Sequence, residues 1–243
     1  MTKVAFVQNL AIEYIGTMYL SAALKAYGHQ VEVFIGSDNK QLISEIVSYQ
    51  PDLLAFSCTT GTESWCLQVA SRVREQISVK VILGGPHPTF FPEIINEEPV
   101  DIICIGEGDQ AIVEIADMLQ RGEYSTDIAN CWFRIKNEII KNPPRPLIKN
   151  LDSLQFPDRD LYRRKYSFLR SGTLSIFTGR GCPFDCSYCF NKALKDLYKG
   201  KGAYVRKRSV DSVIDEIKRF RLNNEIRTVY FYDDTFFVNR NWL

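Results

Sequence analysis

Five short apolar segments in the first part of this 243-residue chain constrain its fold more than any other feature. These segments, several of them rich in β-branched residues, are 3–7, 31–35, 52–57, 79–85 and 101–106. Such runs are typical of strands buried on both faces of a parallel sheet. The segments between them repeat apolar residues at helical spacing, as from Ile15 to Leu24. This alternation predicts a doubly wound, Rossmann-like (flavodoxin-like) α/β domain over residues 1–122, with its ligands at the carboxyl ends of the strands.

The pattern changes after Gly122. Residues 130–142 predict a β-hairpin that turns at Lys136 and Asn137, and a proline-rich stretch follows. We therefore expect residues 123–172 to form a linker with little core of its own. A second βα series then begins, with a strand at 174–179, an amphipathic helix at 210–222 and a further strand at 227–237. This last part, residues 173–243, is interpreted as a separate domain.

Composition narrows the choice of partners and compartment. The net charge of +1 gives no electrostatic reason to expect a nucleic acid or an anionic membrane surface. The N-terminus lacks the long apolar region of a signal peptide, and no run reaches the length of a spanning helix. We expect a cytoplasmic protein that acts on a small molecule. Cytoplasmic thiols stay reduced, so clustered cysteines point to a metal or to catalysis before disulfides.

Three cysteines, Cys182, Cys186 and Cys189, crowd into the segment TGRGCPFDCSYCFN. A structural zinc site would need a fourth ligand nearby, and the next candidates lie far upstream in the sequence. An iron–sulfur cluster held by three thiolates would instead leave one iron free to bind another molecule. The glycines of this segment allow a tight turn around such a cluster. The residues favour a cluster, while zinc and incidental cysteines stay open as alternatives.

The spacing Cys182-x3-Cys186-x2-Cys189, with Tyr188 before the last cysteine, resembles the signature of the radical S-adenosylmethionine (SAM) enzymes. The resemblance implies a 4Fe–4S cluster whose open iron binds SAM. It also implies an external electron donor of the flavodoxin or ferredoxin type, and reductive cleavage of SAM to methionine and a 5′-deoxyadenosyl radical. Tyr188, Asp233 and Asp234 are the candidate SAM-binding residues, the two acids because they stand at the end of the second strand of this domain. Either acid could also simply cap that strand.

The strand-end loops of the first domain, together and in this order, resemble the cobalamin-binding domain of the B12-dependent radical SAM enzymes. Each loop alone would also suit an ordinary sharp βα turn. Small and hydroxylated residues there admit close approach of a large polar cofactor. The residues that the resemblance assigns to cobalamin are Asn9, Gly16, Ser57, Thr59, Thr60, Gly84, Gly85, Pro86, Gly106, Glu107 and Gly108.

One departure from the methionine-synthase type of B12 domain concerns cobalt. That type has an Asp-x-His-x-x-Gly loop after its first strand, and alignment on Gly16 puts Ala11 and Glu13 where the Asp and His would stand. We therefore expect base-off cobalamin without a histidine ligand. His87, between two prolines, is expected to structure its loop, and His29 is expected at the surface.

The remaining cysteines and the tryptophans are interpreted as packing residues. They are Cys58, Cys66, Cys104, Cys131, Trp65, Trp132 and Trp242.

A radical SAM barrel has about six βα units, whereas residues 174–243 hold only two strands and one helix of that pattern. The expected architecture is a cobalamin domain, a linker and the start of an incomplete barrel. We expect a piece of a longer enzyme, with poor solubility or oligomerisation from its exposed sheet edge.

The leading hypothesis is a cobalamin-dependent radical SAM methyltransferase, oxidoreductase or cyclase. A non-catalytic cobalamin or nucleotide carrier with a structural metal loop is the second. A radical SAM enzyme whose first domain is vestigial is a third.

Overall fold

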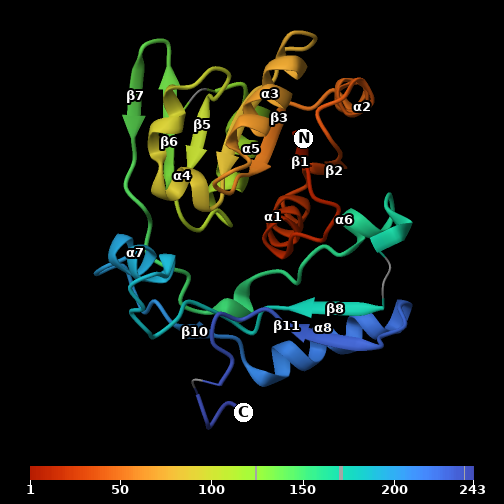
Figure 1. Ribbon diagram of the computed structural model, residues 1–243, viewed down its shortest axis with the longest axis vertical. Helices are drawn as coiled ribbons and strands as arrows, with labels where there is room; N and C mark the ends of the chain where they lie inside the picture. Colours follow the sequence, from red (N-terminus) through yellow and green to blue (C-terminus); the bar gives the residue numbers. More distant parts are fainter. Residues whose placement is uncertain (124, 170–171, 238) are drawn as a thin grey trace.

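A seven-stranded sheet dominates the computed structural model, which describes all residues except 124, 170, 171 and 238. The strand order is β2-β1-β3-β4-β5-β6-β7 (Figure 1). The first five strands are parallel and the last two run antiparallel. Their bounds are β1 (Lys3–Gln8), β2 (Gln30–Ile35), β3 (Leu53–Ser57), β4 (Lys80–Gly84), β5 (Ile102–Cys104), β6 (Cys131–Ile135) and β7 (Glu138–Lys141). The order 2-1-3-4-5 confirms the predicted flavodoxin-like α/β fold.

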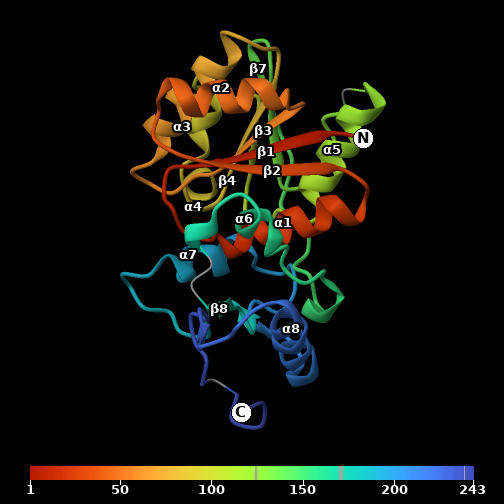
Figure 2. The same cartoon turned by 90° about the vertical axis from the view of Figure 1, so that its right-hand side faces the viewer.

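Helices cover both faces of this sheet (Figure 2). Helices α1 (Ile15–Ala26) and α5 (Ala111–Arg121) contribute buried apolar residues to one core cluster, and α2 (Lys40–Tyr49) and α3 (Glu63–Arg74) to the other. Alternate residues of each strand point into opposite clusters because strand side chains alternate between faces. Full burial of each large aliphatic side chain contributes about 1.5–3 kcal/mol, so the two clusters hold the sheet in place.

A short helix, α4 (Pro86–Phe90), and the 3₁₀ turn η1 (Pro92–Asn96) follow β4, where the sequence predicted only a loop. Pro86 stands in the first turn of α4, where its missing N–H costs nothing. The helix brings Thr89 against the ends of two strands. Its Oγ1 donates to the carbonyl of Gly85 at 2.8 Å and accepts from the N–H of Gly106 at 3.0 Å.

The predicted hairpin is present as β6 and β7, and it extends the first sheet. Cys131 lies opposite Cys104 of β5, and Trp132 lies opposite Ile103. The Arg134 guanidinium adds a hydrogen bond from Nε to the carbonyl of Val100 at 2.8 Å. The hairpin therefore packs as part of the first unit, while the boundaries at 122 and 172 stay predictions.

The rest of the predicted linker runs along α1 through η2 (Leu151–Ser153), α6 (Asp160–Arg163) and η3 (Ser167–Leu169). Buried Tyr162 donates from Oη to the side-chain oxygen of Gln8 at 2.6 Å. The ion pair between Arg163 and Glu13, at 2.9 Å, is also buried. These contacts fasten the linker to the end of β1 and to the loop that follows it.

A second, smaller unit lies at the carboxyl ends of the strands of the large sheet (Figure 1). Its parallel strands β8 (Thr173–Ile176) and β11 (Thr228–Phe231) are connected through α7 (Phe190–Leu197) and α8 (Val210–Asn223). Two residues each of β9 (Gly179–Arg180) and β10 (Arg206–Lys207) form an antiparallel pair. Its core comprises Leu174, Ile176, Val213 and Phe220. The strand predicted at 227–237 is shorter, because the chain turns where Asp233 bonds to Thr178.

No helix in the described ranges has both the length and the apolar character needed to cross a membrane.

Candidate functional site

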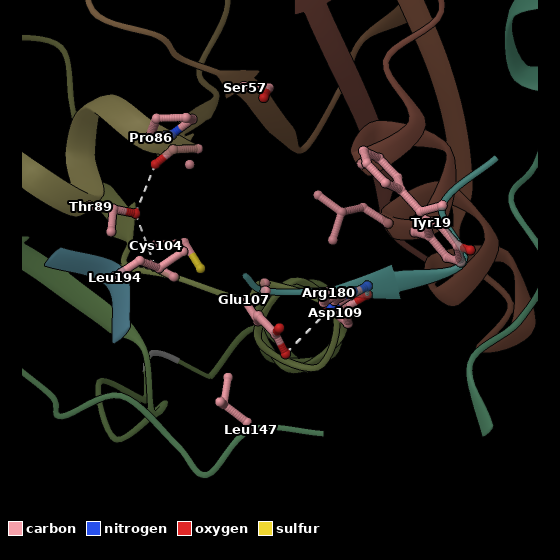
Figure 3. Close-up of a pocket in the computed structure, with 18 of the residues that line it drawn as sticks. Tyr19, Ser57, Pro86, Thr89, Cys104, Glu107, Asp109, Leu147, Arg180 and Leu194 are labelled. Atoms are coloured by element: carbon pink, nitrogen blue, oxygen red, sulfur yellow. Dashed lines mark hydrogen bonds and ion pairs between the residues drawn. The ribbon is translucent and has the colours of Figure 1, made fainter. Parts of the chain in front are cut away.

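A cavity of about 450 Å³ lies between the two α/β units (Figure 3). The large sheet contributes the ends of β3, β4 and β5 with the loops that follow them, and α1 contributes Gly16, Thr17, Tyr19 and Leu20. The second unit contributes β9, the start and end of α7 and β10. The site therefore lies where a doubly wound sheet ordinarily binds ligands, and the second unit encloses it.

Two glycines at the strand ends of the cavity pack directly against other parts of the chain. Gly85 has φ +93°, and a Cβ there would stand 3.0 Å from the carbonyl oxygen of Cys58. Gly106 has φ +76°, and a Cβ there would stand 1.9 Å from Oη of Tyr198. Only glycine adopts these conformations without strain, and neither position has room for a side chain. Glycine at these two positions therefore lets the loops after β4 and β5 pack against Cys58 and Tyr198. Gly16 and Gly84 are the open positions, since a Cβ at either would meet nothing closer than 3.8 Å.

Eight of the eleven residues assigned to cobalamin by resemblance line this cavity. They are Gly16, Ser57, Gly84, Gly85, Pro86, Gly106, Glu107 and Gly108. Asn9, Thr59 and Thr60 lie outside the lining; the hydroxyl of Thr60 instead contacts Nδ1 of His87 at 3.1 Å. The open positions at Gly16 and Gly84 and the nearby Ser57 hydroxyl fit a large cofactor with polar substituents. The individual contacts stay predictions.

Charged side chains cross between the two units at one side of the cavity (Figure 3). Arg180 donates to both carboxylate oxygens of Asp109 at 2.8 and 2.9 Å. Arg206 pairs with Glu107 at 2.5 Å. Burial by itself would raise the pKa of Asp109, but the charge and hydrogen bonds of Arg180 outweigh burial and lower it. The loop after β5 is thus bound to β9 and β10 by ion pairs.

The three predicted cluster ligands occupy one loop at the edge of this cavity. Cys182 is 8% exposed, Cys189 is half-buried and Cys186 is exposed, and all three are free thiols. The loop turns at Gly181, where φ is +85° and a Cβ would stand 2.3 Å from the carbonyl oxygen of Tyr204. Gly181 before the loop and Phe190 after it both line the cavity. The three cysteines do not themselves line the cavity, and their loop adjoins it through these two flanking residues.

The donor set distinguishes between the metals considered for this loop. Nowhere in the described ranges do three His, Cys, Asp or Glu side chains converge closely enough to hold one ion. Zinc needs four donors around a single point, with Zn–S distances of about 2.3 Å. A four-iron cluster takes one thiolate per iron, so its ligands stand apart. Three separated thiols on one loop fit the cluster better than zinc.

The predicted SAM-binding residues divide into different environments. Tyr188 is 90% exposed, and its hydrogen bond with Cys186 raises the pKa of its phenol. Asp233 is buried at the side chain and accepts from the N–H of Thr178 at 3.0 Å, from its Oγ1 at 2.6 Å and from Lys207 Nζ at 3.0 Å. Asp234 is exposed and lines the cavity. Asp233 is thus occupied within the protein, whereas Asp234 is available to a ligand.

Neither histidine belongs to the cavity lining. His87 contacts Thr60 and stacks on Phe91 with ring centroids 5.3 Å apart, as expected of a loop-structuring residue. The expectation that His29 lies at the surface is wrong. It is 4% exposed, its Nε2 is 3.1 Å from Asp117, and its Nδ1 accepts from the N–H of Thr2. This ring therefore accepts a hydrogen bond from the residue just before β1, a contact that the local sequence did not indicate.

The interpretation of the other cysteines and of the tryptophans as packing residues is confirmed. Cys58, Cys66, Cys104 and Cys131 are buried in the two core clusters of the large sheet. Trp65 and Trp132 pack against the second of these clusters, and Trp242 packs against the core of the small unit.

Sequence reasoning missed several polar residues of the site. Arg180, Asn191, Tyr198, Tyr204 and Arg206 all line the cavity. Tyr198 ends α7, and its Oη accepts from the N–H of Glu107 at 2.7 Å. Burial, together with the charge of Asp234, raises the pKa of Tyr204, so its hydroxyl stays protonated. Their partners are distant in sequence, so local patterns could not reveal these contacts. The sequence signal that could have identified these residues is their clustering within 27 residues around the cysteine loop.

Comparison with known families matches both parts of the chain. Residues 4–116 match the B12 binding domain, and residues 176–243 match the Radical SAM superfamily. An uncharacterized methyltransferase of Pyrococcus horikoshii is 30% identical over 93% of this chain and 50% of its own length. The anaerobic magnesium-protoporphyrin IX monomethyl ester cyclase of Rubrivivax gelatinosus is 29% identical over 82% of this chain and 37% of its own.

Solved structures show the same fold. The radical SAM methyltransferase TsrM of Kitasatospora setae, with tryptophan and a SAM analogue bound, superposes with a TM-score of 0.72 at 18% identity. It matches 96% of this chain and 48% of its own. The cobalamin-dependent SAM radical enzyme OxsB gives a TM-score of 0.77 at 22% identity, over 97% of this chain and 34% of its own. The chain thus spans about half or less of the length of these proteins.

Proposed function

This chain belongs to the cobalamin-dependent radical SAM enzymes, and we propose that it carries the part of such an enzyme that holds its three cofactors. The observation that carries the proposal is the shared cavity. The glycine-lined strand ends of the B12 domain and the residues flanking the cysteine loop face the same space. When bound, the cluster and SAM supply a carbon radical, and cobalamin supplies a methyl carrier.

Different parts of the chain would bind different cofactors. Cys182, Cys186 and Cys189 would hold the 4Fe–4S cluster, and Asp234 and Tyr188 would contact SAM. Gly16 and Gly84 would admit cobalamin to the backbone, with Ser57 donating a hydrogen bond to it. Tyr198, Arg180 and Arg206 hold the two halves of the site together.

The reaction proposed for the whole protein is methyl transfer or oxidative cyclisation at an unactivated position of a small organic molecule. Methyltransferases and cyclases both stand among the relatives. An external one-electron carrier of the flavodoxin or ferredoxin type would reduce the cluster. We place the protein in the cytoplasm, where reduced thiols persist, with no nucleic-acid partner.

Anaerobic reconstitution tests the cluster. We expect about four irons per chain in the wild type, because three thiolates suffice to hold a four-iron cluster. Cys186→Ser should lose most of the bound iron, whereas Cys66→Ser, a buried packing cysteine, should retain it. Formation of 5′-deoxyadenosine after reduction with SAM distinguishes an enzyme from a non-catalytic module. One zinc per chain and no deoxyadenosine would refute the proposal.

Titration with hydroxocobalamin tests the other half of the site. Gly84 lines the cavity, and a Cβ there would lie 3.8 Å from its nearest neighbour, so Gly84→Val should fold and narrow the cavity. We expect at least tenfold weaker binding. Gly36→Val is the matched control, because Gly36 lies outside the lining and its Cβ would have ordinary contacts at 3.6 Å. Equal affinity in both variants would place cobalamin elsewhere.

We propose base-off binding of cobalamin without a protein histidine. Glu13, at the position aligned with that ligand, is buried in its ion pair with Arg163, and His87 is held by Thr60. The absorption spectrum of bound cob(II)alamin should be the same in the wild type and in His87→Ala. A spectral change confined to His87→Ala would reveal a histidine ligand.

A further inference from the structure

A buried asparagine contacts one of the three cluster-loop cysteines. Asn191 is the second residue of α7, is 4% exposed and lines the cavity. Its Nδ2 lies 3.6 Å from Sγ of Cys189, and its Oδ1 accepts from Oη of Tyr204 at 2.7 Å. Tyr204, Asn191 and Cys189 therefore form a chain of hydrogen bonds that ends on sulfur.

Cys189 and Tyr204 together orient the amide of Asn191: the thiolate can face only its N–H end, and the hydroxyl of Tyr204, which can donate or accept, then donates to its oxygen. An amide nitrogen can only donate, an amide oxygen can only accept, and a thiolate can only accept. With Oδ1 bound to the Tyr204 hydroxyl, the N–H groups face Cys189. The opposite orientation would set Oδ1 against a thiolate and lose that bond. Tyr204 is itself placed by the close packing of Gly181 against its backbone.

Hydrogen bonds to cluster sulfurs affect the ease of reduction. A reduced cluster carries one more negative charge, some of it on its thiolates, and a donor N–H stabilises that charge. The hydroxyl of Tyr204 polarises the amide of Asn191 and strengthens its N–H as a donor, because bonds in such a chain reinforce one another. Both effects raise the reduction potential.

We propose that Asn191 is a positioning residue that raises the reduction potential of the cluster through Cys189, with Tyr204 as its orienting partner. The inference rests on the proposed function, since it requires a cluster on Cys182, Cys186 and Cys189. Asn191 touches a ligand of the cluster and acts through it. A hydrogen bond from Asn191 would bring the reduction potential of the cluster closer to that of its electron donor.

Redox titration of the reconstituted chain, monitored by the electron paramagnetic resonance signal of the reduced cluster, tests the proposal. Asn191→Ala removes the donor, and Asn191→Asp keeps the shape while replacing the N–H by an anionic acceptor. Both should shift the midpoint potential to more negative values, Asp more than Ala. Tyr204→Phe removes only the orienting hydroxyl and should give a smaller shift in the same direction. Ala193→Ser, exposed on the same helix, is the control and should give no shift.

The outcomes separate this inference from the proposed function. Failure of the wild type to bind iron would overturn the proposed function. Iron binding with potentials that are the same in the wild type, Asn191→Ala and Tyr204→Phe would overturn the inference alone. If Asn191→Ala fails to retain a cluster, the potential of Tyr204→Phe tests the inference instead. This substitution removes one oxygen atom that contacts Asn191 and leaves the cysteine ligands untouched.

Discussion

Arg180 and the buried Asp109 form a bidentate ion pair that joins the two α/β units, with nitrogen–oxygen distances of 2.8 and 2.9 Å. Asp109 follows β5 of the large sheet, and Arg180 belongs to β9, two residues before the first cysteine of the cluster loop. The position of that loop is therefore coupled electrostatically to the strand end that would hold cobalamin.

Removal of either partner should destabilise the protein more than replacement of both. Asp109→Ala leaves the guanidinium of Arg180 with only its longer contact to Glu107 at 3.4 Å. It should therefore cost part of the about 3–5 kcal/mol of unfolding free energy that is typical of a broken buried pair. The double variant Asp109→Leu with Arg180→Leu should recover most of that loss. Urea unfolding at pH 7 measures both. The exposed pair Arg121–Glu123 is the control, and Glu123→Gln should cost less than about 1 kcal/mol. If the double variant loses more unfolding free energy than Asp109→Ala, the coupling between the two residues is contradicted.

The same carboxylate makes stability depend on acid pH. The pKa of Asp109 is lowered in the folded state, so its contribution is fully present above its unfolded value of about 3.9. That contribution is lost as the pH falls through the lower folded pKa. Unfolding free energies of the wild type measured from pH 6 down to pH 3 should fall more steeply than those of Asp109→Asn. Parallel curves would show that Asp109 is not linked to acid unfolding.

Gly106 and Tyr198 should interact strongly in a double-mutant cycle. Gly106→Ala adds backbone strain of about 1–2 kcal/mol at positive φ and an overlap with Oη of Tyr198 that costs about 1–3 kcal/mol more. Gly122→Ala is the matched control, because Gly122 has φ +65° and open space around it, which leaves only the strain. In a Tyr198→Ala background, the cost of Gly106→Ala should fall to that of Gly122→Ala. Thermal unfolding of the four variants tests this.

The neighbouring acids Asp233 and Asp234 should have opposite phenotypes. Asp233→Ala leaves Lys207 and Thr178 without their acceptor and should cost about 3–5 kcal/mol of unfolding free energy, the range for breaking a buried pair. Asp234→Ala should leave the unfolding midpoint unchanged and weaken SAM binding, measured by calorimetry on the reconstituted protein. Loss of SAM affinity in neither variant would remove both residues from the SAM site.

Local patterns in the sequence were sufficient to predict the parallel strands of the large sheet. The strands β1, β3, β4 and β5 are runs of apolar residues that both faces bury, and short βα connections make neighbours in sequence neighbours in the sheet. The hairpin was also predictable from its turn at Lys136 and Asn137. Its pairing with β5 was not, since Cys104 and Cys131 meet only through a long-range register. The cysteine loop was recognisable because ligand spacing is local.

The environment of the site was less predictable. Asp233 and Asp234 were both candidates, because adjacent residues at a strand end point in different directions and sequence does not say which faces the cavity. Tyr198 acts on Glu107 from 91 positions away, and nothing near either residue indicates the contact. Asn191 could have been suspected from its place beside Cys189, but its orientation depends on Tyr204.

The absent Cβ of Gly106 and the ring of Tyr198 share one volume, although the two residues belong to different structural units. A substitution at either position is therefore acceptable only when the other compensates, and the two units cannot diverge independently. A chimera that joins this B12 domain to the second unit of a relative would have a hole or a collision at this point unless the end of α7 is exchanged with it. Recombination within the family therefore has to exchange the loop after β5 and the end of α7 together.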